Sequence, residues 1–213
     1  MPKAQRKTME VEAVKDEILD QAVQIMFEEG FEGLSMRKLA SAMGMTAANI
    51  YNYYRSKDEI YLAIQKQGFE LLHSLFAQVA GLDIPPVEKL RRMARVYVTF
   101  GLEEVAYYEV MFNRHGPKYA DYKNTPMEPL ALAEKMAALQ VLGEAESVAG
   151  EVLAEIGGLE DKDVWQHLMQ AWLLLHGYVA LYNNRTLHEV EEQPAVLIES
   201  ILNTLTGFAI HQR

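Results

Sequence analysis

Apolar residues recur at helical spacing along almost the whole chain, and this pattern limits the fold more than any other feature. Spacings of three and four residues place Ile18, Ala22 and Met26 on one side of a predicted helix. No run of alternating β-branched residues bounded by turn residues interrupts the pattern. The sequence therefore predicts an all-α protein with about nine helices.

Glycines, prolines and capping residues divide this helical pattern. Gly30 is expected to end a first helix over 11–29, and Ser35 and Thr46 are expected to cap the next two, which end at Gly44 and near Tyr54. A fourth helix begins at Ser56, which has capping-box spacing with Glu59, and runs to about residue 80. Further helices are predicted over 87–102, 104–112, 129–156 with a break at Gly143, 161–183 and 194–210, and a loop over 113–126.

Two basic windows stand out in a chain whose formal net charge is −10. Residues 1–8 and residues 33–57 contain Lys and Arg but no Asp or Glu. An acidic body would repel a polyanion everywhere except at such windows, so DNA remains a possible partner. The lack of cysteine excludes disulfides and cysteine-ligated metal sites. The start of the chain lacks the apolar core of a secretory signal, and the apolar stretch 171–182 is too short to span a bilayer, so we expect a cytoplasmic protein without a membrane segment.

Residues 36–55 have the layout of a helix-turn-helix. Gly44 stands where the turn requires a positive φ, which costs other residues about 1–2 kcal/mol. Thr46 then caps the second helix and leaves its N-terminal amides available to a phosphate. The same pattern also occurs in helical proteins that do not bind DNA, where the nearby tyrosines would be core residues.

The predicted faces of the second helix of this motif suggest chemistry for reading DNA. At about 100° per residue, Ile50 and Tyr54 point towards the core, while Ala48 and Asn52 point away from it, flanked by Tyr51. An amide can bond adenine bidentately, an alanine can contact a thymine methyl group, and a tyrosine hydroxyl can bond a phosphate. The outward face therefore favours contact with a major groove.

The stretch from 30 to 60 also contains a specific series of motifs: Gly30-Phe31, Ser35-Met36-Arg37, Leu39-Ala40, Met43-Gly44-Met45-Thr46, Ile50-Tyr51-Asn52-Tyr53-Tyr54 and Ser56-Lys57-Asp58-Glu59-Ile60. Together they resemble the DNA-binding domain of the TetR family of transcriptional regulators. The resemblance implies a helix-turn-helix DNA-binding domain over 1–57, a helical ligand-binding and dimerisation domain over 58–213, and a homodimer on a two-fold operator. The DNA contacts that it implies, together with Arg37 from the basic window, are Ser35, Arg37, Thr46, Ala47, Ala48, Asn49, Tyr51, Asn52, Tyr53 and Lys57.

The second half of the chain resembles the family less closely. Trp172, His176 and Gly177 are similar to the Trp-His-Gly signature of one C-terminal subgroup. Aromatic residues concentrate in the two helices predicted over 87–112, where they would form either an effector pocket or ordinary core. The candidate lining of a pocket for a small, largely apolar effector is Tyr97, Phe100, Tyr108, Met111, Phe112, Trp172 and His176.

These observations favour a ligand-responsive transcriptional repressor rather than an enzyme. The helices over 161–183 and 194–210 are rich in apolar residues and are expected to form a four-helix dimer interface. We expect no cofactor and no metal, since the Glu-x-x-His spacing of Glu70 and His73 has no second copy. The alternatives are an all-α enzyme or carrier with purely structural N-terminal helices, and an architectural DNA-binding protein that lacks a cavity in residues 85–185.

Overall fold

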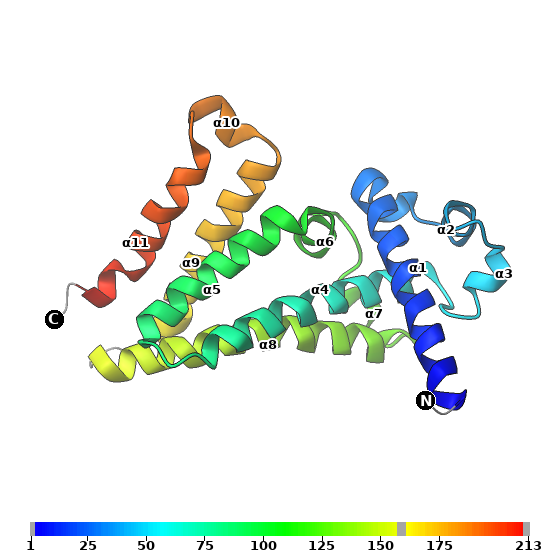
Figure 1. Cartoon of the computed structure of the whole chain (residues 1–213), viewed down its shortest axis with the longest axis horizontal. Coiled ribbons are helices and arrows are strands. Elements are labelled where there is room, and N and C mark those ends of the chain that lie inside the picture. The colour runs from blue at the N-terminus through cyan, green and yellow to red at the C-terminus, as the bar shows by residue number, and fades with distance from the viewer. Residues whose placement is uncertain (1–2, 157–160, 211–213) are drawn as a thin grey trace. The chain divides into compact units, whose positions relative to one another are not determined.

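The computed structural model describes the backbone of residues 3–156 and 161–210 and the side chains of residues 9–154 and 164–205. Within these residues the regular elements are all helical, which confirms the predicted all-α class (Figure 1). The elements are α1 (Lys3–Gly33), α2 (Met36–Ala42), α3 (Ala47–Ile50), α4 (Lys57–Ala80), α5 (Pro86–Glu103), α6 (Val105–Tyr108), the π-helical turn η1 (Glu109–Asn113), α7 (Tyr119–Tyr122), α8 (Glu128–Ile156), α9 (Asp161–Asn183), α10 (Thr186–Val190), the 3-10 turn η2 (Pro194–Val196) and α11 (Leu197–Ile210).

The described residues form more helices than the sequence predicted. Eleven α-helices are present instead of about nine, and α7 and α10 are among the additional ones. The predicted loop over 113–126 was wrong in part, because α7 lies inside it. Helices of four or five residues are too short to show a periodic apolar pattern. The break predicted at Gly143 was also wrong: α8 continues through this exposed glycine, where an added Cβ would meet no atom within 4 Å.

The chain divides into two compact units. Unit 1 comprises Met1–Phe69 and Ala106–Ala137, and unit 2 comprises Glu70–Val105 and Ala138–Arg213. These units are defined by packing. They therefore do not test the boundary at residue 57 between a DNA-binding domain and a ligand-binding domain, which the family resemblance implies. That boundary stays a prediction.

The core of unit 1 is built around α1. Ile18, Ala22 and Met26 are fully buried, which confirms the predicted apolar side of this helix. Their partners in the same cluster include Leu39 of α2 and Ile50 of α3, so the three N-terminal helices share one core. Gly30 has φ 76° and ψ 179°, and it interrupts α1 close to the predicted end, after which one more helical turn follows.

The π-helical turn η1 is fixed against α4 inside unit 1. The buried amide of Gln65 donates to the carbonyl of Val110 at 3.3 Å and to the hydroxyl of Tyr61 at 3.1 Å. A Cβ at Gly68 would lie 2.3 Å from the sulfur of Met111, so the two segments approach too closely for a larger side chain. These contacts hold the second segment of unit 1 against its first.

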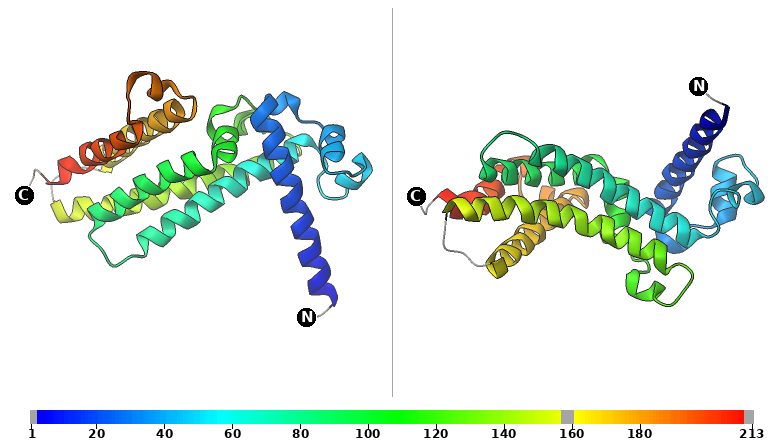
Figure 2. Two further views of the ribbon diagram at one scale, coloured as in Figure 1. Left: turned by 45° about the horizontal axis from the view of Figure 1, so that its top comes forward. Right: turned by 90° about the horizontal axis from the view of Figure 1, so that it is seen from below.

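Unit 2 consists of helices that pack side by side. Helix α5 contacts both α9 and α11 (Figure 2). The side-chain amide of Asn183 at the end of α9 donates to the carbonyl of Gly101 in α5 at 2.9 Å. At the other helix pair, Arg91 and Arg95 of α5 both bind Glu199 of α11. Apolar packing and cross-helix polar contacts thus join the three helices.

No helix in the described parts of the chain combines the length and apolar character needed to cross a membrane.

Candidate nucleic-acid interface

The turn of the helix-turn-helix segment (residues 36–55) is closed by local interactions. Ser35 caps α2 by accepting a hydrogen bond from the backbone N–H of Lys38 at 3.2 Å, as predicted. Gly44 has φ 63°, a left-handed conformation that favours glycine. The N–H of Met45 then donates to the carbonyl of Ala40 at 2.8 Å. Capping and one glycine therefore set how the chain leaves α2.

Helix α3 begins as predicted but ends earlier. Thr46 caps it by accepting from the N–H of Asn49 at 3.2 Å. The predicted end near Tyr54 was wrong, since regular α-helix stops at Ile50. Beyond it three- and four-residue spacings mix: the N–H of Asn52 bonds to Asn49 and that of Tyr53 to Ile50, while that of Tyr54 also bonds to Ile50. The segment remains a compact turn, because such tightening is common at helix ends.

The two faces of α3 and the following turn differ in burial as predicted. Ile50 is completely buried and Tyr54 is 7% exposed, whereas Ala48 and Asn52 are exposed and Tyr51 is 53% exposed. Burial raises the pKa of Tyr54 to about 12, so its hydroxyl stays protonated inside the unit. The short segment formed by α3 and the following turn therefore has a polar face towards solvent and an apolar face towards the core.

Two of the predicted DNA contacts are partly used by the core. Ala47 and Tyr53 are half-buried and pack against the N-terminal cluster of unit 1. The exposed residues of the predicted set are Ser35, Arg37, Thr46, Ala48, Asn49, Tyr51 and Asn52. The basic window over 1–8 lies outside the described side chains.

The cations of the helix-turn-helix segment divide into paired and unpaired groups. Lys57 binds Glu32 at 3.0 Å and lies 4.1 Å from the centre of the Phe31 ring. Lys38 forms an ion pair with Glu29. Arg37 and Arg55 are exposed, and among the described residues they form no ion pair. Reasoning from the sequence missed these glutamate partners, although both lie immediately before the acid-free window.

The first turn of α4 is held from two sides. Ser56 accepts from the N–H of Glu59 at 3.1 Å, and Glu59 accepts from the N–H of Arg55 at 2.6 Å. The serine half of the predicted capping box is confirmed, while the glutamate reaches one residue further back than the motif requires. On the other side, the hydroxyl of Tyr122 in α7 donates to Asp58 at 2.9 Å. The turn that carries Lys57 is therefore fixed within unit 1.

The predicted effector lining falls into two groups, one in each unit. In unit 2, the indole N–H of Trp172 donates to the hydroxyl of Tyr97 at 3.1 Å, and that hydroxyl lies 3.4 Å from Nδ1 of His176. Phe100 is buried in the same unit. These four residues offer an apolar surface with polar groups already bonded to one another.

In unit 1, the rings of Phe112 and Tyr108 lie 4.9 Å apart, and Phe112 also contacts Phe69 edge-on at 5.6 Å. Tyr108 and Met111 are buried. Close ring packing of this kind is also typical of ordinary core. The predicted lining residues are thus divided between the two units, and their role in ligand binding stays a prediction.

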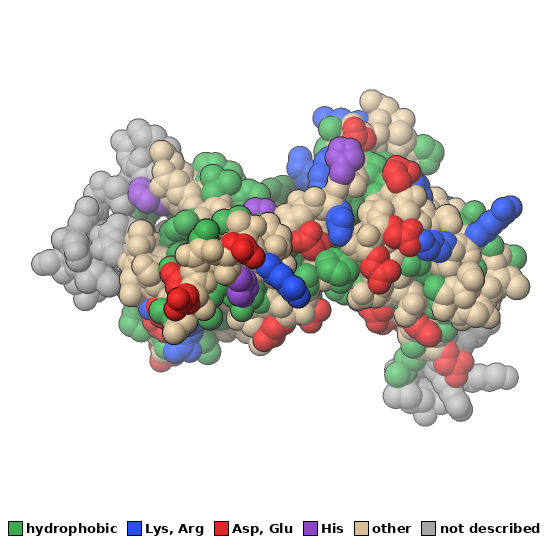
Figure 3. All heavy atoms as spheres, turned by 90° about the horizontal axis from the view of Figure 1, so that it is seen from above, with side chains coloured by type: hydrophobic (Ala, Val, Ile, Leu, Met, Phe, Trp, Pro, Cys, Tyr) green, Lys and Arg blue, Asp and Glu red, His purple; other side chains and the backbone are tan. Residues whose placement is uncertain are grey.

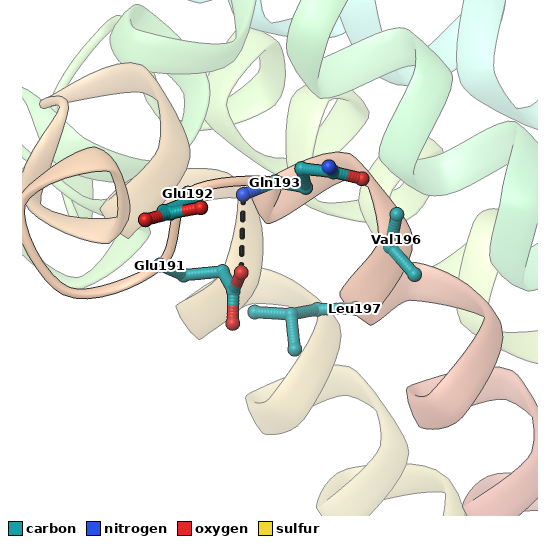
Figure 4. Close-up of a pocket in the computed structure, with 5 residues that line it drawn as sticks. All are labelled: Glu191, Glu192, Gln193, Val196 and Leu197. Carbon is teal, nitrogen blue, oxygen red and sulfur yellow. Dashed lines mark hydrogen bonds between the residues drawn. The ribbon is translucent and has the colours of Figure 1, made fainter.

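One surface hollow lies at the turn between α10 and α11 (Figure 4). It has a volume of about 200 Å³ and is lined by Glu191, Glu192, Gln193, Val196 and Leu197. The N–H of Gln193 donates to the carboxylate of Glu191 at 3.0 Å. None of the predicted lining residues belongs to this hollow, which is smaller than the roughly 300–1,000 Å³ of typical small-molecule pockets.

Metal-binding groupings are absent from the described part of the chain, where no three His, Cys, Asp or Glu residues come together. His73, one half of the Glu-x-x-His spacing, lies 3.6 Å from Glu144 of α8. This contact is a carboxylate–histidine pair inside unit 2.

Known proteins resemble the chain in sequence and in structure. Over 115 residues it is 24% identical to the biofilm operon icaADBC HTH-type negative transcriptional regulator IcaR of Staphylococcus aureus, a match that covers 54% of this chain and 56% of that protein. The chain thus spans about half the length of the curated relatives it matches.

Among solved structures, the TetR-family regulator PfmR from Thermus thermophilus aligns with a TM-score of 0.63 and 21% identity over 76% of this chain and 84% of its own. The fatty acid degradation regulator FadR from Bacillus halodurans aligns with a TM-score of 0.69 and 16% identity over 91% and 94%. At these identities the two structures establish the fold alone.

Two family models match the chain. The model for bacterial regulatory proteins of the tetR family matches residues 18–64, and the tetracyclin repressor-like C-terminal domain matches residues 90–205. The second match covers more than half of the chain, and the first covers the helix-turn-helix segment whose caps and turn are described above. The chain therefore belongs to the TetR family of bacterial regulatory proteins.

Proposed function

We propose that this protein is a DNA-binding transcriptional repressor that binds a two-fold operator as a homodimer and leaves it when a small, largely apolar effector binds. The observation that carries the proposal is the exposed face of α3 and its following turn. There Ala48 and Asn49 of the capped helix and Asn52 of the turn after it are exposed. Arg37 and Arg55 of the same segment are also exposed and form no ion pair among the described residues. Amide, methyl and guanidinium groups are the common readers of base edges and phosphates.

The predicted contacts have two kinds of role in this proposal. Asn52 bonds a base edge, and the backbone N–H groups at the start of α3 and the side chain of Lys57 bind phosphates. The resemblance to a negative regulator supports repression, and membership of a regulatory family favours this function over the alternative of an enzyme or carrier.

Dimerisation is proposed through α9 and α11. Helix α9 exposes large apolar side chains at Trp165, Leu173, Leu174 and Leu181, with Leu173 63% exposed. Several large apolar side chains exposed on one helix commonly mark an interface between subunits. The side chains at 161–163 and 206–210, in the same two helices, lie outside the described residues. Light scattering should give a mass of twice 24.2 kDa at micromolar concentration, and a monomer would contradict the interface.

Effector control is proposed to act along α4. This helix runs without interruption from Lys57 to Ala80, so residues beside the proposed DNA contact and residues of the second unit belong to the same helix. A ligand shifts such an equilibrium only if it binds one state more tightly. Coupling of about 1–3 kcal/mol would weaken DNA binding roughly 5- to 150-fold.

The test of DNA binding begins with selection of a bound sequence from a random duplex pool. Asn52→Ala should relax discrimination at particular base pairs by roughly 1–3 kcal/mol, whereas Lys57→Ala should weaken binding to all sequences about equally. Gln140→Ala and Lys89→Ala, which change an exposed amide and a lysine of unit 2, are the matched controls. If neither Asn52→Ala nor Lys57→Ala altered binding, the assigned face would be wrong.

The two tryptophans of the chain provide a test of the effector site. Both lie on α9, so Trp165→Phe leaves Trp172 as the only reporter. An apolar naphthalene dye should change the fluorescence of Trp172, and Tyr97→Phe should alter its affinity because the hydroxyl bonded to the indole is lost. Dye binding that never affects the selected duplex would contradict effector control and leave DNA binding unaffected.

A further inference from the structure

Three lysines surround Tyr119 in the second segment of unit 1. Lys123 and Lys135 place their ammonium groups 5.5 and 4.7 Å from the centre of the Tyr119 ring, and Lys118 precedes that residue in the chain. All three lysines are exposed. Within the described residues no carboxylate forms an ion pair with any of them. We call Lys118, Lys123 and Lys135 the lysine cluster.

The acidic groups of the same segment are engaged with other partners. Asp121 accepts from the backbone N–H of Lys118 at 2.7 Å and caps α7. Glu128 accepts from the N–H of Asn124 at 2.8 Å and from the hydroxyl of Tyr119 at 3.4 Å. Glu109 accepts from Asn113 at 2.7 Å. These carboxylates complete local structure, so the outward charge of the segment comes mainly from the lysines.

Glu134 of α8 is the remaining acid of this segment. It is half-buried, and burial raises its pKa while Lys118 acts in the opposite direction. Its carboxylate does not bridge to a lysine of the cluster, so it attenuates the positive charge without cancelling it.

Unpaired lysines are unusual in the α-helical surface of this acidic chain. On α5, by contrast, Lys89 pairs with Glu151, Arg92 with Glu88, and Arg91 with Glu199. Over the face drawn in Figure 3, Asp and Glu side chains are spread widely, and Lys and Arg side chains lie among them. A concentration of unpaired cations in such a surface favours binding of an anionic partner.

The position of the cluster favours DNA as that partner. Helix α7 lies beside the N-terminal end of α4, where Tyr122, itself buried, donates to Asp58 (Figures 1 and 2). Asp58 follows Lys57, the proposed phosphate contact, in the same helical turn. The cluster and the helix-turn-helix segment are also parts of one compact unit. A duplex bound at α3 would therefore bring further phosphates towards α7.

We propose that Lys118, Lys123 and Lys135 contact the backbone phosphates of DNA flanking each operator half-site. This contact rests on the proposed function and extends its footprint outward. It is independent of sequence, since ammonium groups act on phosphates as point charges. The ring of Tyr119 orients two of the lysines through cation–π contacts, which lessens the entropy lost when they bind.

The test compares two duplexes that contain the same selected site. The short duplex has about 20 bp, enough for two half-sites one helical turn apart, and the long duplex has about 40 bp. The variant is Lys118→Gln/Lys123→Gln/Lys135→Gln. The control, Lys89→Gln/Arg92→Gln/Arg185→Gln, removes the same positive charge from unit 2. Circular dichroism and thermal unfolding establish that both variants fold.

The variant should bind the long duplex at least roughly tenfold more weakly, with the slope of log affinity against log salt reduced by up to about 5, because the homodimer loses three lysines in each subunit. Its binding to the short duplex should match the wild type. In the wild type, the long duplex should protect the three lysines from acetylation by acetic anhydride, measured by mass spectrometry.

Several results would overturn the proposal. Equal affinity of variant and wild type for the long duplex would do so, as would an equal loss in the control, which would indicate a general charge effect. Acetylation of the cluster unchanged by DNA would show that the bound duplex does not cover these lysines. If the wild type bound neither duplex, the proposed function itself would fail. If instead the wild type bound and the variant bound equally well, only the role of the lysine cluster would fail.

Discussion

The cations of α5 and those of unit 1 are arranged in opposite ways. Each of the four cations of α5 has a carboxylate partner, and Glu199 of α11 serves two of them, Arg91 and Arg95. In unit 1 the exposed cations of the helix-turn-helix segment and of the lysine cluster include five that form no ion pair among the described residues. These are Arg37, Arg55, Lys118, Lys123 and Lys135.

This difference distinguishes charges that join helices from charges that remain available to a partner. An exposed ion pair contributes only about 0–1 kcal/mol to stability. Its other effect is to neutralise a cation that would otherwise attract a polyanion. The pairs on α5 therefore neutralise its cations, and two of them join it to α11, while the unpaired cations of unit 1 keep their attraction for phosphate.

The largest expected effect is the response of DNA binding to salt. If six or more phosphates are contacted, affinity should fall roughly a thousandfold or more between about 50 and about 200 mM salt. Arg37→Gln/Arg55→Gln should reduce the log–log slope by up to about 4, because the homodimer loses two arginines in each subunit and each neutralised phosphate contributes about 0.9. Fluorescence anisotropy of a labelled selected duplex measures both quantities.

The corresponding change on α5 is the control for this prediction. Arg92→Gln/Arg95→Gln should leave the slope unchanged, since both arginines already have carboxylate partners in unit 2. A slope that depended equally on the two pairs of arginines would mean that net charge, and not the unit 1 surface, determines binding.

A second prediction separates stability from recognition within α3. Ile50 is completely buried, so Ile50→Ala should lower the free energy of unfolding by about 2–5 kcal/mol. Asn52→Ala, on the exposed side, should change it by less than about 0.5 kcal/mol. Urea unfolding followed by circular dichroism provides the comparison. If the two substitutions cost the same, the division of this element into two faces would be wrong.

Local rules explain why the helix-turn-helix segment could be predicted closely. Ser35, Gly44 and Thr46 act on the next three or four residues, and each adopts the conformation expected from its chemistry. The early end of α3 was missed because a residue's preference for α-helix or for a tighter turn depends on what it packs against. Tyr53, half-buried against the core, is such a residue.

Long-range pairing explains most of what the sequence did not indicate. Lys57 and Glu32 are 25 residues apart, and Arg91 and Glu199 are 108 apart, so no local pattern connects them. The lysine cluster was missed for the same reason: Lys135 joins Tyr119 from a different helix. The assignment of the proposed effector-lining residues to two packing units likewise depends on contacts that sequence spacing does not show.

A third, smaller effect is expected at the ion pair that occupies Lys57. The side chain of Glu32 is 88% exposed and that of Lys57 is 30% exposed, so the pair is open to exchange with a phosphate. Glu32→Gln should free Lys57 and remove a negative charge near DNA, which should strengthen binding roughly two- to fivefold. Glu151→Gln, which frees Lys89 in unit 2, should have no such effect. If Glu32→Gln instead bound the selected duplex more weakly, Glu32 would be shown to position Lys57 for DNA.

The smallest expected effect is the pH dependence of stability that comes from the ion pairs between α5 and Glu199. Arg95 and then Arg91 hold the pKa of Glu199 below its ordinary value. Because the folded state lowers this pKa, the stabilisation is complete above the ordinary carboxyl pKa of about 4.3 and is lost as the pH falls through the lower, folded value.

Glu199→Gln should therefore lower the melting temperature slightly at neutral pH, and the two melting curves should converge in acid, where the wild-type carboxyl is also uncharged. Its affinity for the selected duplex should stay that of the wild type, because the two arginines that lose their partner belong to unit 2 and not to the proposed DNA-binding surface. A rise in affinity would show that the freed arginines of α5 also attract phosphate. The contrast between α5 and unit 1 would then depend on carboxylate pairing and not on where the cations lie.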